Sequence, residues 1–219
     1  MTTAIAVAAI FGAILGFGAD RLSSRWPEHE DETIRGFDWR TVAVVAGGAA
    51  AFGLLAWRWT DPADFVVLGI YVAALIVLLA TDLDQKLLPD LITFPLMGYA
   101  LAVMLLGLNP VLEGKTQVLV ADGDLGAIIA AVAAPALLAI TDRIFRGALG
   151  MGDLKLAVSL GLMFGVTQLF AGFLVGTVAF AAVVLVLLLS RRVSMKTAVP
   201  FGPALIVAGV MAAVLEFPT

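Results

Sequence analysis

The chain has 219 residues, of which 62% are hydrophobic and only 14% are charged, and its net charge is −4. A soluble domain is typically about half apolar and about a quarter charged, so a water-exposed fold could not hide this excess of apolar surface. The composition excludes a soluble enzyme and predicts an all-α, polytopic membrane helix bundle, and without a basic stripe we expect no nucleic-acid partner.

Uncharged apolar runs predict the membrane spans, because most of them are close to the roughly 20 residues that cross a bilayer. The first run has no positively charged residue before it, which a signal peptide normally has. It is therefore expected to be a retained span that starts outside the cell. The predicted spans are residues 1–19, 41–57, 65–81, 91–112, 125–141, 156–190 and 197–215.

The run 156–190 is too long for one span. As a single helix its 35 residues would extend about 52 Å, against a hydrocarbon core of about 30 Å. We therefore expect two helices, with a break near residues 165–168. This interpretation raises the predicted number of transmembrane helices to eight.

The basic residues test this count, since cytoplasmic loops of membrane proteins are rich in lysine and arginine. With eight spans, odd-numbered loops contain eleven basic residues and even-numbered loops contain two, whereas seven spans would give eight against five. Eight spans therefore fit better and predict that both termini are extracytoplasmic. The eleven are Arg21, Arg25, Arg35, Arg40, Lys86, Arg143, Arg146, Lys155, Arg191, Arg192 and Lys196.

Residues 20–40 form the one sizeable polar segment near the N-terminus, and we interpret it as a solvated cytoplasmic linker. It contains an acidic cluster at residues 28–32 around His29, the single histidine of the chain. A lone histidine has no companion for a metal site or a serine–histidine pair. The absence of cysteine excludes disulfides and thiolate metal sites, so we expect neither a metal nor a cofactor.

The segment Thr81–Asp90 places three carboxylates, Asp82, Asp84 and Asp90, at the end of the predicted span 65–81. Carboxylates near lipid are energetically costly and usually mark a polar cavity or a functional site. Pro89 predicts a break in the helix, and Asp90 is expected to cap the next helix. For Asp84, a solvated helix end and a functional role remain equally open.

A second carboxylate, Asp153, follows Gly150, Met151 and Gly152 just before another apolar run. Asp153 is also suited to be the N-cap of a helix that begins near Leu154, so its position alone leaves both interpretations open. The predicted topology places Asp82 and Asp153 on the cytoplasmic side at similar depth. A glycine-rich mobile loop with one carboxylate, beside a helix end with another, is typical of an aspartyl protease, in which two carboxylates share a proton.

These motifs resemble a known family. Asp82-Leu83-Asp84 with Leu88-Pro89-Asp90 is similar to the first active-site segment of the type IV prepilin peptidases. The stretch Gly150-Met151-Gly152-Asp153-Leu154-Lys155-Leu156 resembles their second segment, the GxGD motif. Val199-Pro200-Phe201-Gly202-Pro203 is similar to the segment that opens the last helix in that family. The resemblance spans nearly the whole chain.

The resemblance implies a single transmembrane peptidase domain over residues 1–219, with Asp82 and Asp153 as the catalytic pair. Members of that family remove basic leader peptides from type IV prepilins or pseudopilins at the cytoplasmic face of the plasma (inner) membrane. They cut just before the hydrophobic helix of the substrate, and the resemblance implies the same activity here. Lipid is the other partner that the resemblance implies, while the oligomeric state stays open. The supporting residues in this interpretation are Gly150 and Gly152, which shape the mobile loop, together with Asp84, Asp90 and Lys155.

One departure from the family concerns residues 20–40. Many bacterial members have at this place a longer loop with two CxxC pairs, which binds zinc and is associated with N-methylation of the new terminus. The short loop here contains no cysteine, so the resemblance implies the peptidase and not the methyltransferase.

Two other classes of protein remain as alternatives. A cation-binding transporter or channel could use Asp82, Asp84 and Asp153 as hard oxygen ligands. The predicted spans contain no acidic residue, although a transport path normally carries polar groups near the bilayer midplane. The third alternative is a membrane scaffold in which the two carboxylates are inactive.

Overall fold

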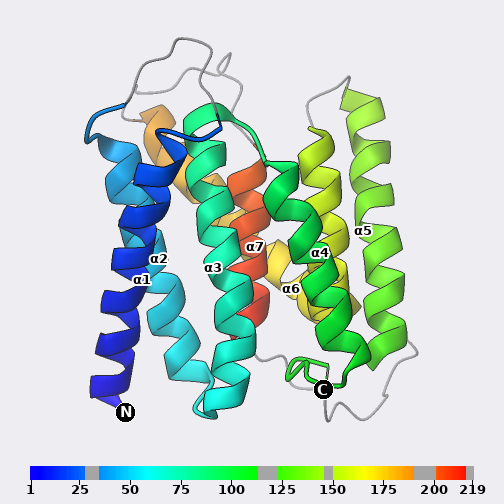
Figure 1. The fold of residues 1–219 in the computed structure, drawn as a ribbon. Helices are drawn as coiled ribbons and strands as arrows, with labels where there is room; N and C mark the ends of the chain where they lie inside the picture. Colours follow the sequence, from blue (N-terminus) through cyan, green and yellow to red (C-terminus); the bar gives the residue numbers. More distant parts are fainter. Residues whose placement is uncertain (28–34, 113–122, 146–149, 190–200, 216–219) are drawn as a thin grey trace.

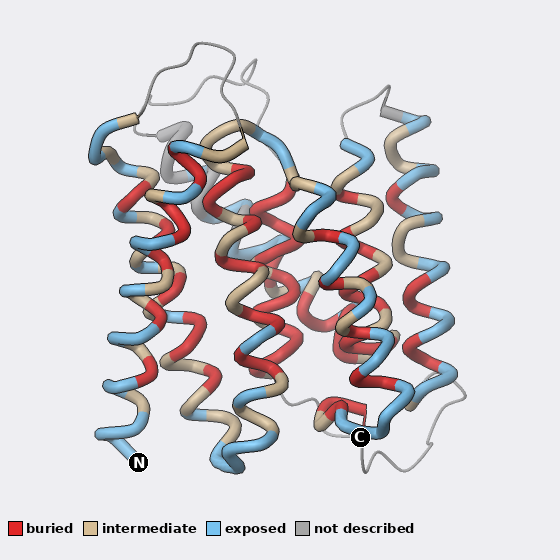
Figure 2. The backbone as a smooth tube through the Cα atoms, viewed as in Figure 1, coloured by how far each residue is buried: buried red, intermediate tan, exposed pale blue. Residues whose placement is uncertain are grey.

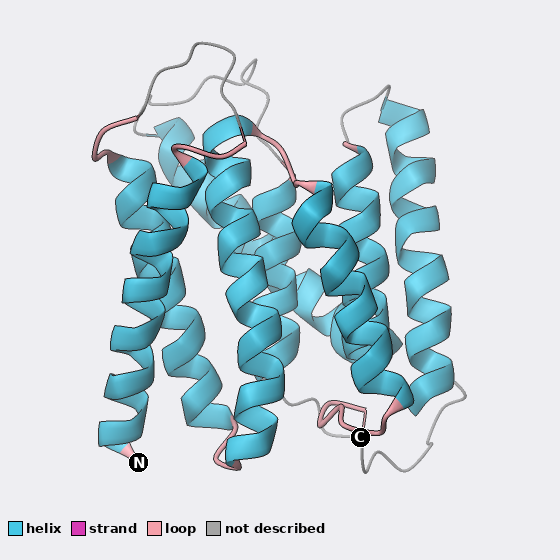
Figure 3. Ribbon diagram, in the orientation of Figure 1, coloured by secondary structure: helices cyan, strands magenta, loops and turns pink. Residues whose placement is uncertain are grey.

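Helices make up the whole fold in the part of the chain that the computed structural model describes, residues 1–27, 35–112, 123–145, 150–189 and 201–215, which contains no strand (Figures 1 and 3). The prediction of an all-α fold is confirmed. The helices are α1 (Thr2–Ser23), α2 (Trp39–Arg58), α3 (Pro62–Gln85), α4 (Asp90–Leu105), α5 (Gly123–Phe145), α6 (Met151–Leu189) and α7 (Gly202–Val214).

Among the described residues, five helices are long and apolar enough to cross a membrane, by length and composition. They are α1, α2, α3, α5 and the Met151–Ala179 part of α6, whereas α4 and α7 have 16 and 13 residues. A multi-pass bundle is therefore confirmed. The count of eight spans and the placement of the termini outside the cell stay predictions.

The helix boundaries differ from the predicted spans where charged residues continue a helix. α1 continues to Ser23 and α3 to Gln85, so Asp20 and Asp82 lie within helices and not in loops. α4 ends at Leu105 instead of reaching residue 112, because Gly107 adopts a φ of 63° that glycine favours. The N–H of Gly107 donates to Met104 O and that of Leu108 to Val103 O, which is the pattern of a Schellman helix end.

The predicted break in the long apolar run is confirmed at Gly165, which has φ 67° and ψ −176° inside α6. Two helical segments meet at this kink, and α6 changes direction there in Figure 1. Carbonyls released by a kink need partners, because lipid supplies none. The side chain of Asn109, which is buried, donates from Nδ2 to Met163 O at 2.9 Å and stabilises the kink.

α3 lies at the centre of the bundle and packs against α1, α2, α4 and α7. In Figure 2 buried residues gather on the helix faces that meet inside the bundle, and exposed residues follow the outer faces. Tyr71 of α3 and Ser159 of α6 are both fully buried, and their hydroxyl groups form a hydrogen bond of 2.9 Å. This contact joins the two helices that carry Asp82 and Asp153.

Candidate functional site

Asp82 lies in the last turn of α3 and is only 4% exposed. Lys86 ends the helix with φ 57°, and its backbone N–H donates to Asp82 O at 2.9 Å. Oδ2 of Asp82 is buried and has no hydrogen-bond partner within the described residues. A buried polar atom normally has a partner, so this unpaired oxygen distinguishes Asp82 from an ordinary buried carboxylate.

Asp153 lies in the first turn of α6 and is 8% exposed. Its Oδ2 accepts a hydrogen bond of 3.0 Å from the N–H of Gly150, and its own N–H donates to Gly150 O at 3.1 Å. The carboxylate therefore belongs to the helix start and is fixed by the backbone. The prediction that a mobile loop carries Asp153 is wrong, because Asp153 lies inside α6. This helix begins at Met151, ahead of the expected start near Leu154.

The structure brings Asp82 and Asp153 to the same end of the bundle, where α3 ends and α6 begins (Figure 1). They are close enough for the charge of Asp153 to act on the Asp82 carboxyl, on which Lys86 also acts. Two neighbouring carboxyl groups that hold one proton between them offer both a base and an acid. The pair can therefore activate water and protonate a leaving group.

Gly202, at the start of α7, completes this site and is absent from the residues that the sequence assigned to it. A Cβ atom at residue 202 would lie 2.7 Å from both Cγ and Oδ2 of Asp82 and 2.9 Å from Oδ1. A glycine is therefore required for α7 to contact the carboxyl group. The signal in the sequence was the segment Val199–Pro203, whose Val199 and Pro200 lie outside the described residues.

The two glycines beside Asp153 have different roles. Gly152 is the second residue of α6, and a Cβ there would lie 2.8 Å from Cβ of Leu88, in the segment between α3 and α4. Gly150 precedes the helix, and a Cβ there would meet Oδ2 of Asp153 at an ordinary 3.6 Å. Gly152 therefore permits close packing of two segments of the site, which differs from the predicted role in loop mobility.

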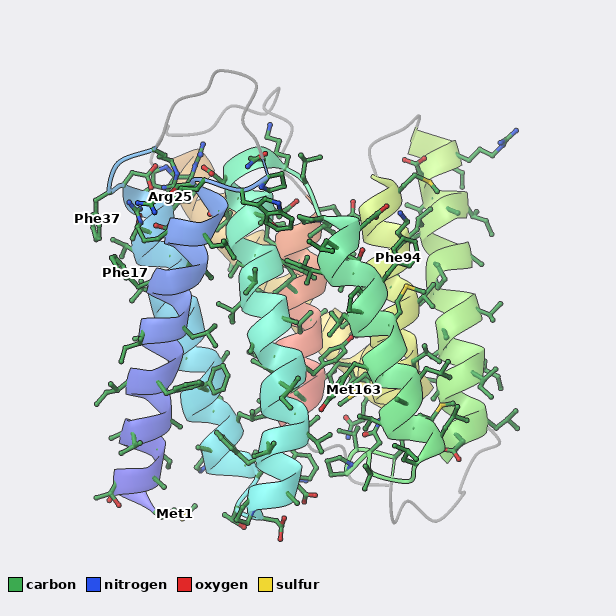
Figure 4. The ribbon with its side chains drawn as sticks, in the orientation of Figure 1. Met1, Phe17, Arg25, Phe37, Phe94 and Met163 are labelled. Carbon is green, nitrogen blue, oxygen red and sulfur yellow. The ribbon has the colours of Figure 1, made fainter. Side chains whose placement is uncertain are left out.

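Asp90 and Lys155 pair with each other across the same end of the bundle. Lys155 Nζ lies 2.5 Å from Oδ1 of Asp90, and it also lies 4.7 Å from the ring centroid of Phe94, which Figure 4 labels beside α4. The pair connects the first turn of α4 to the second turn of α6. The prediction that Asp90 is an N-cap is wrong, because Asp90 is the first residue inside α4 and the N-cap is Pro89.

Asp84 lies two residues after Asp82, and its side chain is only 3% exposed. Oδ1 of Asp84 pairs with Nε of Arg35 at 2.7 Å and with Nη1 of Arg40 at 2.9 Å. Arg35 also pairs with Oδ1 of Asp20 at 2.5 Å and with Asp38. Asp84 is therefore neither a solvated helix end nor a member of the carboxylate pair, but part of an ion-pair network.

The network extends to α2, since Thr41 donates its hydroxyl hydrogen to Oδ2 of Asp20 at 2.9 Å. Asp20 itself is completely buried. Burial opposes the charge of the Arg35 guanidinium, but its hydrogen bond with Asp20 and the nearby charges of Asp84, Asp20 and Asp38 raise the pKa of Arg35 above its usual value. The interpretation of residues 20–40 as a solvated linker is therefore wrong for Asp20, which is buried and paired, whereas Arg25 and residues 36–37 are exposed. Residues 28–34 with His29 lie outside the described part.

Asp84→Asn is expected to lower the thermal stability, because it removes one partner of two arginines without touching the Asp82 carboxyl. Loss of a charged hydrogen-bond partner costs about 2 kcal/mol where the remaining partners are partly solvated. Thermal unfolding in detergent would measure the effect. Asp64→Asn, in the first turn of α3, is the control expected to leave the unfolding temperature unchanged. An Asp84→Asn variant that unfolds like the wild type would contradict the role of the network.

The described residues contain no group of three His, Cys, Asp or Glu side chains that could hold a metal ion. The arrangement at this end of the bundle therefore consists of a carboxylate pair, a contacting glycine and two sets of ion pairs. Of the predicted site residues, the structure brings Asp82, Asp153, Gly150 and Gly152 together. It places Asp84 in a separate network.

Comparison with known proteins gives results that agree with one another. A family model described as the type IV leader peptidase family matches residues 69–215. A prepilin leader peptidase/N-methyltransferase of Burkholderia pseudomallei (strain K96243) is 34% identical over 177 residues, which cover 80% of this chain and 53% of that protein. One of Pseudomonas putida is 32% identical over 167 residues, covering 76% and 55%. The chain thus spans about half the length of the curated relatives that it matches, and no solved structure matches it.

Proposed function

Because the chain belongs to the type IV leader peptidase family, we propose that it is an aspartyl endopeptidase that removes the basic leader from type IV prepilins or pseudopilins. Asp82 and Asp153 are its catalytic pair. The observation that carries this proposal is the meeting of two buried carboxyl groups from different helices at one end of the bundle. The relatives are named as methyltransferases as well, and our proposal is confined to the peptidase.

In the proposed reaction, water adds to the carbonyl carbon of the peptide bond between leader and mature protein. One carboxylate takes a proton from the water molecule, and the other carboxyl group donates a proton to the carbonyl oxygen. The C–N bond then breaks, and a proton passes to the leaving amine. In this reaction the unpaired Oδ2 of Asp82 would bind the water molecule or the carbonyl oxygen, while Asp153 is oriented by the N–H of Gly150.

We also propose that the whole chain is one peptidase domain in the inner membrane, with the catalytic pair on the cytoplasmic side. The distribution of basic residues supports this orientation, since the eight-span topology puts eleven of the thirteen on the side of Asp82 and Asp153. Asp84, Arg35 and Arg40 lie near the same end of the bundle and add charge where a membrane interface is expected.

The direct test is cleavage of a peptide with a basic leader followed by a hydrophobic segment, incubated with purified protein in detergent. We expect one cut at the junction, identified by mass spectrometry of both products. A matched peptide whose basic residues are replaced by glutamate is the substrate control and should be cleaved more slowly. No cleavage of either peptide by a folded preparation would overturn the proposal.

Cleavage is expected to persist in excess EDTA, because the proposed mechanism uses carboxyl groups and water and needs no metal. Initial rates with and without the chelator would measure this, with a zinc protease in the same buffer as the positive control. Complete inhibition that a divalent ion restores would instead make the carboxylates metal ligands.

A further inference from the structure

An apolar groove with a volume of about 350 Å³ lies between α5, α6 and α7. Its lining includes Ala130, Ala134 and Leu138 of α5, Ala157 of α6 and Leu205 of α7. The lining residues Leu137 and Phe170 are 65% and 69% exposed, so the groove opens on the outer surface of the bundle. In the membrane this surface faces lipid.

The packing of α5 against α6 places the groove relative to the catalytic pair. A Cβ at Gly161 would lie 2.4 Å from N of Ala131, and a Cβ at Gly165 would lie 3.7 Å from N of Ala127. The two helices are therefore antiparallel at this contact, and a step of four residues toward the C-terminus of α6 corresponds to a step of four residues toward the N-terminus of α5. By this correspondence Leu138 is level with the first turn of α6, which contains Asp153.

The groove therefore starts beside the candidate active site and leads away from it into the bundle. Ala157 lies one helical turn after Asp153, and Leu205 follows Gly202, the glycine that contacts Asp82, by three residues. From Leu138 to Ala130 the groove extends about 12 Å along α5, from the rise of an α-helix.

The substrate of a leader peptidase has its hydrophobic helix directly after the scissile bond. With that bond at Asp82 and Asp153, the helix must continue deeper into the membrane from this point. The groove is open on the outer surface of the bundle, so a helix that lies in it would contact the protein on one face and lipid on the others.

Small residues favour this kind of contact, since they let two membrane helices approach closely. Ala130, Ala133 and Ala134 of α5 and Ala157 of α6 provide such a surface along the groove. We propose that this groove binds one face of the substrate's hydrophobic helix and so positions the scissile bond at Asp82 and Asp153. The inference rests on the proposed function and names the surface by which the substrate is selected.

The test compares two substrates. The long substrate contains the leader and the hydrophobic helix, and the short peptide ends a few residues after the scissile bond. Ala134→Phe fills the groove. We expect it to lower kcat/KM for the long substrate, relative to kcat/KM for the short peptide, about tenfold, which corresponds to about 1.4 kcal/mol. Val132→Phe is the matched control, because Val132 is 67% exposed, about 200° around α5 from Ala134, and does not line the groove. This control should keep the wild-type ratio.

The outcomes separate the two proposals. If the wild type cleaves both substrates but Ala134→Phe keeps the wild-type ratio, the groove does not bind the substrate helix and the proposed function stands. If the folded wild type cleaves neither substrate, the proposed function fails and the inference fails with it.

Photocross-linking provides a second measurement that does not depend on a substitution within the groove floor. A benzophenone amino acid at residue 137, in a chain made inactive by Asp153→Asn, is expected to cross-link to the hydrophobic segment of the long substrate. The same probe at residue 132 should give at least about tenfold less of this product. Cross-links at residue 137 that form only with lipid, or only with a second copy of the chain, would overturn the inference.

Discussion

Replacing either Asp82 or Asp153 by asparagine is expected to reduce cleavage at least about a hundredfold. Asparagine has nearly the same size and shape as aspartate, but it can neither take a proton from water nor share one with the remaining carboxyl group. Positioned proton transfer contributes about 10²–10⁴ to the rate of such reactions, and the loss should appear in kcat. Rates with the short peptide would measure it without a contribution from the hydrophobic helix.

The same two variants are expected to fold. A buried carboxylate is costly, and its neutral amide counterpart removes that cost, so the thermal midpoint in detergent should equal or exceed that of the wild type. Asp64→Asn, on the same helix as Asp82 but in its first turn, is the matched control and should cleave normally. A wild-type rate for Asp82→Asn or for Asp153→Asn would show that the two residues are not the catalytic pair.

Gly202→Ala is expected to have the second largest effect on cleavage. The added methyl group would lie 2.7 Å from Cγ of Asp82, so either the carboxyl group or the start of α7 must move. Displacement of a reacting group by about 1 Å can reduce the rate about a hundredfold. We expect a loss of ten- to a hundredfold, measured as kcat for the short peptide.

A control separates this steric effect from a general effect of alanine in a helix. A Cβ at Gly98 of α4 would meet no other atom within 4 Å, so Gly98→Ala adds the same methyl group in open space. Alanine is also the better helix former, by about 1 kcal/mol, so this variant should be at least as stable as the wild type and fully active. Equal activity of Gly202→Ala and Gly98→Ala would contradict the contact between α7 and Asp82.

The fold and the site could be predicted from the sequence where a strong local signal existed. The apolar run 156–190 is too long for one span and so predicts a break in the helix, and the structure has this break at Gly165. The positions of Asp82 and Asp153 at opposite ends of two runs indicated that they share one face of the membrane. The structure brings both to one end of the bundle.

The remaining features depend on contacts between distant segments, which no local pattern contains. A charged residue ends an uncharged run, so the first span was expected to stop before Asp20. In the structure α1 continues to Ser23, and Asp20 pairs both with its neighbour Arg21 and with Arg35, fifteen residues later. For Asp84 the sequence leaves a solvated helix end and a functional role equally open, whereas in the structure Arg35 and Arg40 pair with it. Gly202 matters because any side chain at this residue would clash with the carboxyl group of Asp82.

The hydrogen bond between Tyr71 and Ser159 has a consequence for how the two carboxyl groups stay aligned. Apolar side chains alone allow two helices to slide along each other, whereas a single polar contact in a dry core fixes their axial register. A slip of one turn would move Asp153 by about 5.4 Å relative to Asp82, too far for the two to share a proton. The hydrogen bond between Tyr71 and Ser159 therefore holds the axial register of α3 and α6, and with it the relative height of Asp82 and Asp153, from within the bundle.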